Sequence, residues 1–179
     1  YQWANKPKSI LDLGCGTASY WKYYPEGIFI LGIEKSNEMR ELSKYKNLIL
    51  LGDITKVNMA MEFDCVTALF DVINYIPKHD WWDNIPVKKG GYLIFDIWNK
   101  DKVNKDGFKI TKKHNKTTVP SRKGNKVILN LFSPEYSELH TMYLYSERDI
   151  VKFCGKNFKI VDKRKTKSWQ KWYKIKRIR

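Results

Sequence analysis

Short apolar runs alternate with polar segments along the first hundred residues. Apolar runs suited to buried strands cover residues 10–13, 27–33, 48–51, 63–69 and 92–97. Such near-continuous runs are typical of parallel strands that are covered on both faces. Helices are expected between them at 17–24, from an N-cap at Ser36 to about Lys44, and at 78–85, with a turn at Lys89-Gly90-Gly91. The pattern predicts alternating strands and helices around one parallel sheet.

The pattern changes after about residue 107. Further strands are predicted at 108–112, 126–132, 139–145, 158–161 and 169–178. Between them, Ser146 and Asp149 can form a capping box for a helix that ends near Cys154. The predicted fold class is α/β: a Rossmann-like, doubly wound, mostly parallel sheet with an antiparallel last strand. We expect one domain over residues 1–179, with an antiparallel β lid inserted after the fifth strand, at about 107–145.

Polar residues follow the predicted strands at a regular interval. Steps of 20, 19 and 21 residues separate Gly14, Glu34, Asp53 and Asn74, and each step is about one strand plus one crossover helix. Right-handed crossovers bring these strand ends to the same carboxyl edge of a sheet. Open α/β sheets bind ligands at that edge, so we expect these residues to converge on one crevice.

The turn after the first strand reads Asp12-Leu13-Gly14-Cys15-Gly16. Glycines at 14 and 16 let the backbone approach a ligand that a Cβ atom would exclude. A dinucleotide fingerprint would require a third glycine at position 19, where this chain has Ser19. A nicotinamide oxidoreductase is therefore disfavoured, and Asp12 is expected to orient the glycine turn.

Composition narrows the class of protein. The apolar content of 42% and aromatic content of 15% suit a packed globular domain. No apolar run is long enough to span a membrane, and no signal peptide is visible. The three isolated cysteines have no zinc-site spacing, so we expect a cytoplasmic protein with free thiols and no metal. Because the chain starts at Tyr1 close to the first strand, an N-terminal segment is expected to be missing.

The net charge of +15 is unevenly distributed. Residues 1–99 contain 11 Lys and Arg against 12 Asp and Glu, whereas residues 100–179 contain 23 against 7. Either a lysine-rich composition or an anionic partner of the second part explains this difference. The tail 168–179 interleaves aromatic and cationic residues, which fits either an edge strand or a nucleic-acid surface.

Successive motifs resemble those of class I S-adenosylmethionine (SAM)-dependent methyltransferases. They lie at residues 10–16, 31–34, 50–54, 63–76 and 89–99. The combination of Ala68-Leu69-Phe70 with Asn74-Tyr75-Ile76 is similar to the branch of glycine and amino-sugar N-methyltransferases, which carries an antiparallel lid. Ala18 stands where the family usually has another glycine, and we expect it to be tolerated through helical dihedrals.

The resemblance implies SAM as cofactor and a role for each strand end. The glycine turn would receive the methionine part, Glu34 the ribose hydroxyls, Asp53 the adenine amino group, and the loop after the fourth strand the sulfonium. The implied cofactor-binding residues are Asp12, Gly14, Cys15, Gly16, Glu34, Lys35, Asp53, Ile54, Leu69, Phe70 and Asn74.

The expected reaction is methyl transfer to a small, anionic acceptor, an amine or a hydroxyl, such as a nucleotide-linked sugar. Since an amine must lose a proton, Tyr75, Asp96 and His140 are the candidate catalytic residues, and His79 is a further candidate. Alternatives are methylation of RNA or DNA, and a non-catalytic SAM-binding basic module. Residues 74–77 do not match the Asn/Asp-Pro-Pro-Tyr motif of amino-directed nucleic-acid methyltransferases. The sequence leaves the oligomeric state open.

Overall fold

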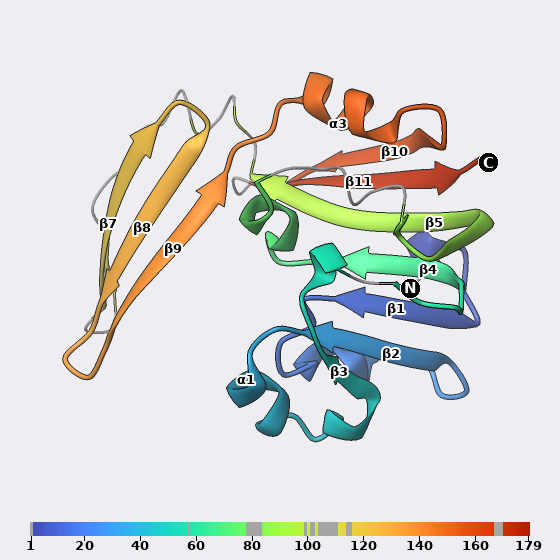
Figure 1. The fold of residues 1–179 in the computed structure, drawn as a ribbon, viewed down its shortest axis with the longest axis horizontal. Helices are drawn as coiled ribbons and strands as arrows, with labels where there is room; N and C mark the ends of the chain where they lie inside the picture. Colours follow the sequence, from blue (N-terminus) through green and yellow to red (C-terminus); the bar gives the residue numbers. More distant parts are fainter. Residues whose placement is uncertain are drawn as a thin grey trace.

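The main sheet of the computed structural model contains seven strands in the order β10-β11-β5-β4-β1-β2-β3 (Figure 1). The structure describes residues 2–56, 58–77, 84–98, 100, 103, 111–113, 116–166 and 170–179. The parallel strands are β1 (Ser9–Leu13), β2 (Phe29–Glu34), β3 (Ile49–Leu51), β4 (Phe63–Ala68) and β5 (Val87–Trp98). The antiparallel strands at one end are β10 (Phe158–Lys165) and β11 (Gln170–Arg177).

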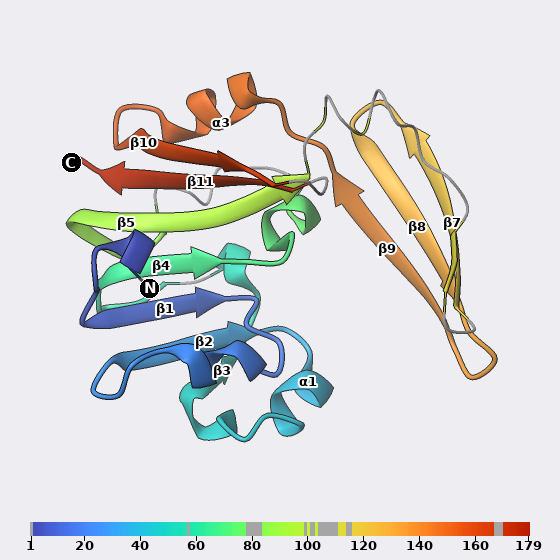
Figure 2. The ribbon, with the colours of Figure 1, turned by 180° about the vertical axis from the view of Figure 1, so that it is seen from behind.

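A second sheet is inserted between β5 and the last helix. It is antiparallel and contains β6 (Thr111–Lys113), β7 (Lys116–Lys123), β8 (Lys126–Phe132) and β9 (Ser137–Tyr143). Figures 1 and 2 show this sheet beyond the carboxyl ends of β1, β4 and β5. The predicted α/β fold class with an antiparallel insert is thereby confirmed. The expected strand at 108–112 and helix at 78–85 lie mostly outside the described residues.

Helices are shorter than the sequence suggests. The segment expected to be helical at 17–24 forms only a 3₁₀ turn, Ser19–Tyr23 (η2), because Tyr20 and Trp21 both donate hydrogen bonds to the buried Asp12. The next helix, α1 (Asn37–Glu41), begins at the expected cap, Ser36, but stops early. Ser43 ends it by binding the Thr17 carbonyl and the Tyr45 N–H.

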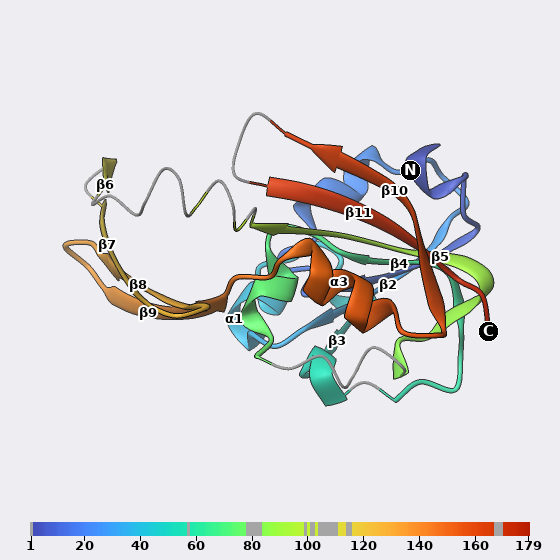
Figure 3. The same ribbon diagram turned by 90° about the horizontal axis from the view of Figure 1, so that it is seen from above.

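The helix α3 (Glu147–Cys154) begins with the predicted capping box of Ser146 and Asp149. It buries Ile150 and Cys154 in the same core as Phe95, Tyr173 and other residues of β5 and β11. The opposite face of the sheet is covered by η2 and by the 3₁₀ turn Gln2–Ala4 (η1). Figure 3 shows η1 and α3 on opposite sides of β5 and β11.

Two expectations about strands are wrong. The turn expected at residues 89–91 lies inside β5, where Gly90 has a φ of +84° and accommodates the register shift opposite Phe63 and Cys65. The C-terminal tail is an interior strand rather than an edge strand, since β11 pairs with both β5 and β10. Its polar pattern is misleading because Lys174 is buried, with its ammonium 4.0 Å from the centre of the Tyr92 ring.

Candidate active site

The glycine turn contacts β2 on one side and the segment after β4 on the other. The N–H groups of Gly14 and Cys15 both donate to the Ile33 carbonyl, at 2.8 and 3.2 Å. Gly14 has a φ of +65°, and a Cβ atom on it would lie 2.7 Å from a methyl carbon of Val72. Val72 begins the 3₁₀ turn Val72–Tyr75 (η5), which follows β4. Only glycine fits position 14, both for its backbone angle and for its space.

Asp12 lies outside the cavity and anchors the segment that follows the glycine turn. Its carboxylate accepts hydrogen bonds from Thr67 and Trp21, at 2.7 Å each, and from Tyr20. Burial raises the pKa of Asp12, although these three donors act in the opposite direction. The contacts join β1, β4 and η2.

Ala18 does not have the helical dihedrals that were expected. Its φ of 54° and ψ of 27° are left-handed. An L-residue with a Cβ atom is strained there by about 1–2 kcal/mol relative to a right-handed conformation. Ala18 is buried and packs with Cys15 and Trp21, so neighbouring contacts hold it in this conformation.

Glu34 stands at the end of β2 and faces the glycine turn. Its Oε2 accepts from the Gly16 N–H at 2.8 Å, and its Oε1 accepts from the N–H groups of Lys35 and Ser36 at 2.9 Å. A carboxylate has about four acceptor positions, so these bonds leave Oε2 able to accept another. The side chain lines the cavity and can take a further donor from a ligand.

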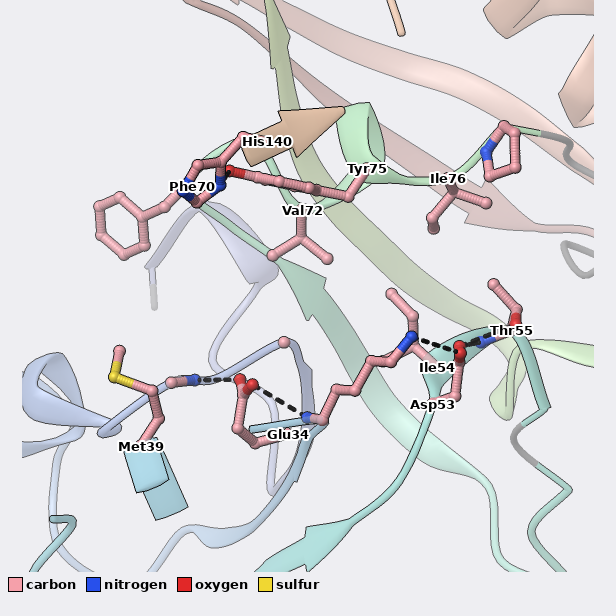
Figure 4. A pocket seen from close by; sticks show the side chains of 14 residues that line it. Glu34, Met39, Asp53, Ile54, Thr55, Phe70, Val72, Tyr75, Ile76 and His140 are labelled. Atoms are coloured by element: carbon pink, nitrogen blue, oxygen red, sulfur yellow. Dashed lines mark hydrogen bonds and ion pairs between the residues drawn. The ribbon is translucent and has the colours of Figure 1, made fainter. Parts of the chain in front are cut away.

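Asp53 follows β3 and carries a similar set of contacts. Its Oδ1 accepts from the backbone N–H and the hydroxyl of Thr55, and Lys35 approaches Oδ2 at 3.2 Å. The Thr55 donors, followed by Lys35, lower the pKa of Asp53. The acid therefore stays ionised at neutral pH. Two carboxylates, Glu34 and Asp53, then flank one side of the cavity (Figure 4).

A cavity of about 990 Å³ lies at the carboxyl edge of the main sheet. Its lining consists of Gly14, Gly16, Glu34, Lys35, Met39, Asp53, Ile54, Thr55, Phe70, Val72, Tyr75, Ile76, Pro77 and His140. Figure 4 shows Phe70, Val72, Tyr75 and His140 on one wall, opposite Glu34 and Asp53. Strand ends distant in the sequence thus converge on one crevice, and β9 of the second sheet adds His140.

Five of the residues expected at the site do not line the cavity: Asp12, Cys15, Leu69, Asn74 and Asp96. Cys15 is buried, and a Cβ atom on Gly32 would lie 2.6 Å from its sulfur. Leu69 packs on the sheet face that η1 covers. Asn74 is completely buried and joins three elements: its amide donates to the Tyr143 carbonyl at 2.6 Å and accepts from the Trp98 N–H at 3.0 Å.

Asp96 lies beneath the loop that follows β4. Its carboxylate accepts from the N–H groups of Phe70 and Asp71, at 2.7 and 3.2 Å. Both residues have left-handed backbones, with φ of 62° and 66°. Asp96 therefore stabilises a strained turn that presents Phe70 to the cavity. Burial, and then the neighbouring Asp71 carboxylate, raise the pKa of Asp96 to about 7.

The raised pKa of Asp96 predicts a pH-dependent stability. Between about pH 4 and pH 7 the folded chain binds more protons than the unfolded chain, so the free energy of unfolding falls as the pH rises through this window. In the parent protein this fall in the free energy of unfolding amounts to a few kcal/mol, and we expect Asp96→Asn to remove most of it. Urea unfolding at several pH values measures the slope, and parallel curves for the two proteins would contradict the assignment.

Tyr75 and His140 meet at the second sheet. The Tyr75 hydroxyl lies 3.0 Å from Nδ1 of His140, and Nε2 of His140 lies 2.9 Å from Oε2 of Glu138. Sequence reasoning missed Glu138, although its spacing of two from His140 places both side chains on one face of a strand. Asp96 is not part of this group. The other candidate, His79, lies outside the described residues.

In the part of the chain that the structure describes, no group of three or more His, Cys, Asp or Glu side chains is arranged to hold a metal ion. Within the same residues, none of the helices has the length and apolar character needed to cross a membrane.

Residues 11–95 match the family model described as a methyltransferase domain. A SAM-dependent methyltransferase from Clostridium acetobutylicum is 21% identical with a TM-score of 0.77, covering 94% of this chain and 83% of that one. No curated protein sequence matches this chain.

Two further solved structures have the same fold at lower identity. CalS10, a SAM-bound amino pentose methyltransferase from Micromonospora echinaspora, is 15% identical with a TM-score of 0.76, covering 96% of this chain and 84% of that one. KedS8, a sugar N-methyltransferase from Streptoalloteichus, is 17% identical with a TM-score of 0.71, covering 98% and 86%. The chain thus contains a segment that matches a methyltransferase domain, and it shares the fold of solved SAM-dependent methyltransferases.

Proposed function

We propose that this enzyme methylates a small, anionic acceptor, an amine or a hydroxyl, such as a nucleotide-linked sugar. The observation that carries the proposal is the cavity of about 990 Å³ between the edge of the main sheet and the second sheet. Its volume lies at the upper end of the usual range for small-molecule pockets, about 300–1,000 Å³. A cofactor and a small acceptor can occupy it together.

The described residues fit SAM on one side of the cavity. When bound, SAM supplies an electrophilic methyl group on its sulfonium. Gly14 and Gly16 line the cavity, and because they have no Cβ atoms the methionine part can approach their backbone closely. Glu34 has an acceptor position for the ribose hydroxyls. Asp53 and Ile54 would bind the adenine, and Lys35 would shift from Asp53 as the adenine amino group arrives.

The other wall suits the acceptor. It is apolar around Phe70, Val72 and Ile76, and its polar groups are the Tyr75 hydroxyl and the His140 imidazole. The chain holds the acceptor against this wall, so that methyl transfer becomes a matter of distance and alignment. Residues 107–145, which include the second sheet, contain seven Lys or Arg against two Glu, and this favours an anionic acceptor. The names of CalS10 and KedS8 also point to sugars as acceptors.

Methylation of nucleic acid is the rival proposal, and the contacts of β11 disfavour it. Trp172 packs edge-on against Trp3 with ring centres 6.4 Å apart, and Arg164 lies over the Trp3 ring at 4.5 Å. The Lys174 ammonium donates to Asn5 and covers Tyr92. These rings and cations are engaged with each other, whereas a stacking surface presents its rings to bases.

Two measurements test the proposed function. Calorimetric titration should show SAM binding to this chain. Release of demethylated cofactor should then be detected with a uridine diphosphate-linked 2-amino sugar as the probe, and not with a short RNA. Added salt should raise the KM for the sugar probe and leave the SAM affinity nearly unchanged, because salt screens attraction to an anionic acceptor. Turnover of the RNA alone, or no SAM binding, would refute the proposal.

A further inference from the structure

We propose that Glu138, His140 and Tyr75 form a proton relay that deprotonates the acceptor, which identifies the acceptor as an amine. This inference rests on the proposed function and narrows its acceptor to one chemical class. The three side chains come from two separate elements: Tyr75 from η5 of the main domain, and the other two from β9 of the second sheet. A proton acceptor thus forms only where the two sheets meet.

The hydrogen bonds define a direction for the proton. Glu138 is an acceptor when ionised, so Nε2 of His140 carries the hydrogen that faces it, at 2.9 Å. Nδ1 then has a free lone pair and accepts from the Tyr75 hydroxyl at 3.0 Å. A histidine whose tautomer is fixed by a second group in this way is arranged as a general base.

Other contacts hold the two elements together independently of the relay. The Asn74 amide donates to the Tyr143 carbonyl at 2.6 Å, and the Tyr145 hydroxyl donates to the Ile76 carbonyl. Both pairs join η5, or the residue after it, to the end of β9 or just beyond. The relay therefore lies on a junction that is already fixed, and Figure 4 shows Tyr75 and His140 pointing toward each other at the cavity wall.

The surroundings keep Tyr75 protonated. Burial, and then the carboxylates of Asp71 and Glu138, raise the pKa of Tyr75. A phenol that stays protonated does not act as the final base, but it can receive one proton while it gives its own to a neighbouring base. Tyr75 is therefore the shuttle and His140 the base, while Glu138 positions the imidazole and stabilises its cation. Among the described residues, the charged groups that act on Tyr75 are Asp71, at the N-cap of η5, and Glu138, from β9.

The step balances without another reactant. An ammonium acceptor first gives one proton to the Tyr75 oxygen as the Tyr75 hydroxyl proton moves to Nδ1 of His140. The freed nitrogen lone pair then forms a bond to the methyl carbon, the carbon–sulfur bond breaks, and its electron pair stays on sulfur. The imidazolium beside Glu138 later loses its proton to water, which restores the starting state.

The test measures kcat, KM and SAM affinity with the uridine diphosphate-linked 2-amino sugar. We expect Tyr75→Phe and His140→Ala each to lower kcat by about 100-fold or more, with SAM affinity unchanged, as for the loss of a general base. Glu138→Gln should lower kcat less. Added imidazole should restore turnover to His140→Ala, which a purely structural role for His140 would not permit. Leu139→Ala is the control, since Leu139 is 66% exposed on the other face of β9.

The outcomes separate this inference from the proposed function. Turnover of the sugar probe with kcat unaffected in both His140→Ala and Tyr75→Phe overturns the relay and leaves the proposed function intact. A lowered kcat that imidazole does not restore also overturns the assignment of His140 as base. Turnover of the uridine diphosphate-linked sugar with a 2-hydroxyl group in place of the 2-amino group, with no turnover of the amino sugar, overturns the amine assignment. No turnover of any small acceptor overturns both proposals.

Discussion

Glu34→Ala should weaken SAM binding by about 100-fold, or about 3 kcal/mol, without unfolding the protein. The substitution removes the acceptor proposed for the ribose hydroxyls. It also removes the partner of the Gly16 N–H, which donates to the carboxylate at 2.8 Å, so Gly16 loses this hydrogen bond to β2. Both effects act on the cofactor side of the cavity, where a charge-assisted hydrogen bond contributes more than a neutral one. Calorimetric titration of SAM measures the change.

Two matched variants sharpen this test. Glu38→Ala removes another carboxylate at the start of α1 that lies outside the cavity, and it should leave SAM affinity unchanged. Glu34→Gln keeps the shape and one acceptor oxygen, so its affinity should fall between those of the parent and Glu34→Ala. Unchanged affinity in Glu34→Ala would remove Glu34 from the proposed ribose site.

Gly14→Ala should lower the free energy of unfolding by about 2–5 kcal/mol and abolish measurable SAM binding. Its backbone has a φ of +65°, which costs an alanine about 1–2 kcal/mol. The added Cβ atom would also lie 2.7 Å from Val72, and overpacking of that kind costs about 1–3 kcal/mol more. Relief of the overlap requires η5 to move, and η5 carries one wall of the cavity. Urea unfolding and SAM titration measure both effects.

Gly27→Ala separates the backbone strain from the overlap. Gly27 has a φ of +81°, yet nothing lies within 4 Å of a Cβ atom placed on it. This variant should lose only the strain energy, about 1–2 kcal/mol, and bind SAM like the parent. Equal losses of stability in Gly14→Ala and Gly27→Ala would show that the close approach to Val72 has no energetic importance.

The first five strands and the crevice at their carboxyl ends were predictable from sequence. Each depends on local signals: apolar runs, the glycine turn, and a spacing of one strand plus one crossover. Glu34 and Asp53 follow their strands directly, so their place at the carboxyl edge follows from the strand assignment. The pairing of β11 with strands on both sides was harder to predict from sequence. Lys174 is buried through contacts with Asn5 and Tyr92, which are remote in sequence.

The roles of other site residues depend on contacts that no local pattern encodes. Asn74 looked like a ligand-binding residue, but its amide binds Tyr143, 69 residues away. Asp96 was a candidate catalytic residue, but its carboxylate binds the N–H group of Phe70 in the loop after β4. The meeting of Tyr75 and His140 depends on the position of an inserted sheet relative to η5, which sequence spacing does not determine.

The residues proposed to bind SAM and those proposed to act on the acceptor belong to two parts of the chain, which meet where β9 contacts η5. The groups proposed to hold SAM all belong to the main sheet and its loops, whereas His140 and Glu138 arrive with the insert. Replacement of the insert by another of different sequence would therefore change which molecules are methylated while the cofactor site stays intact. We expect acceptor preference to change with the insert, which the Asn74 and Tyr145 contacts attach to the main domain.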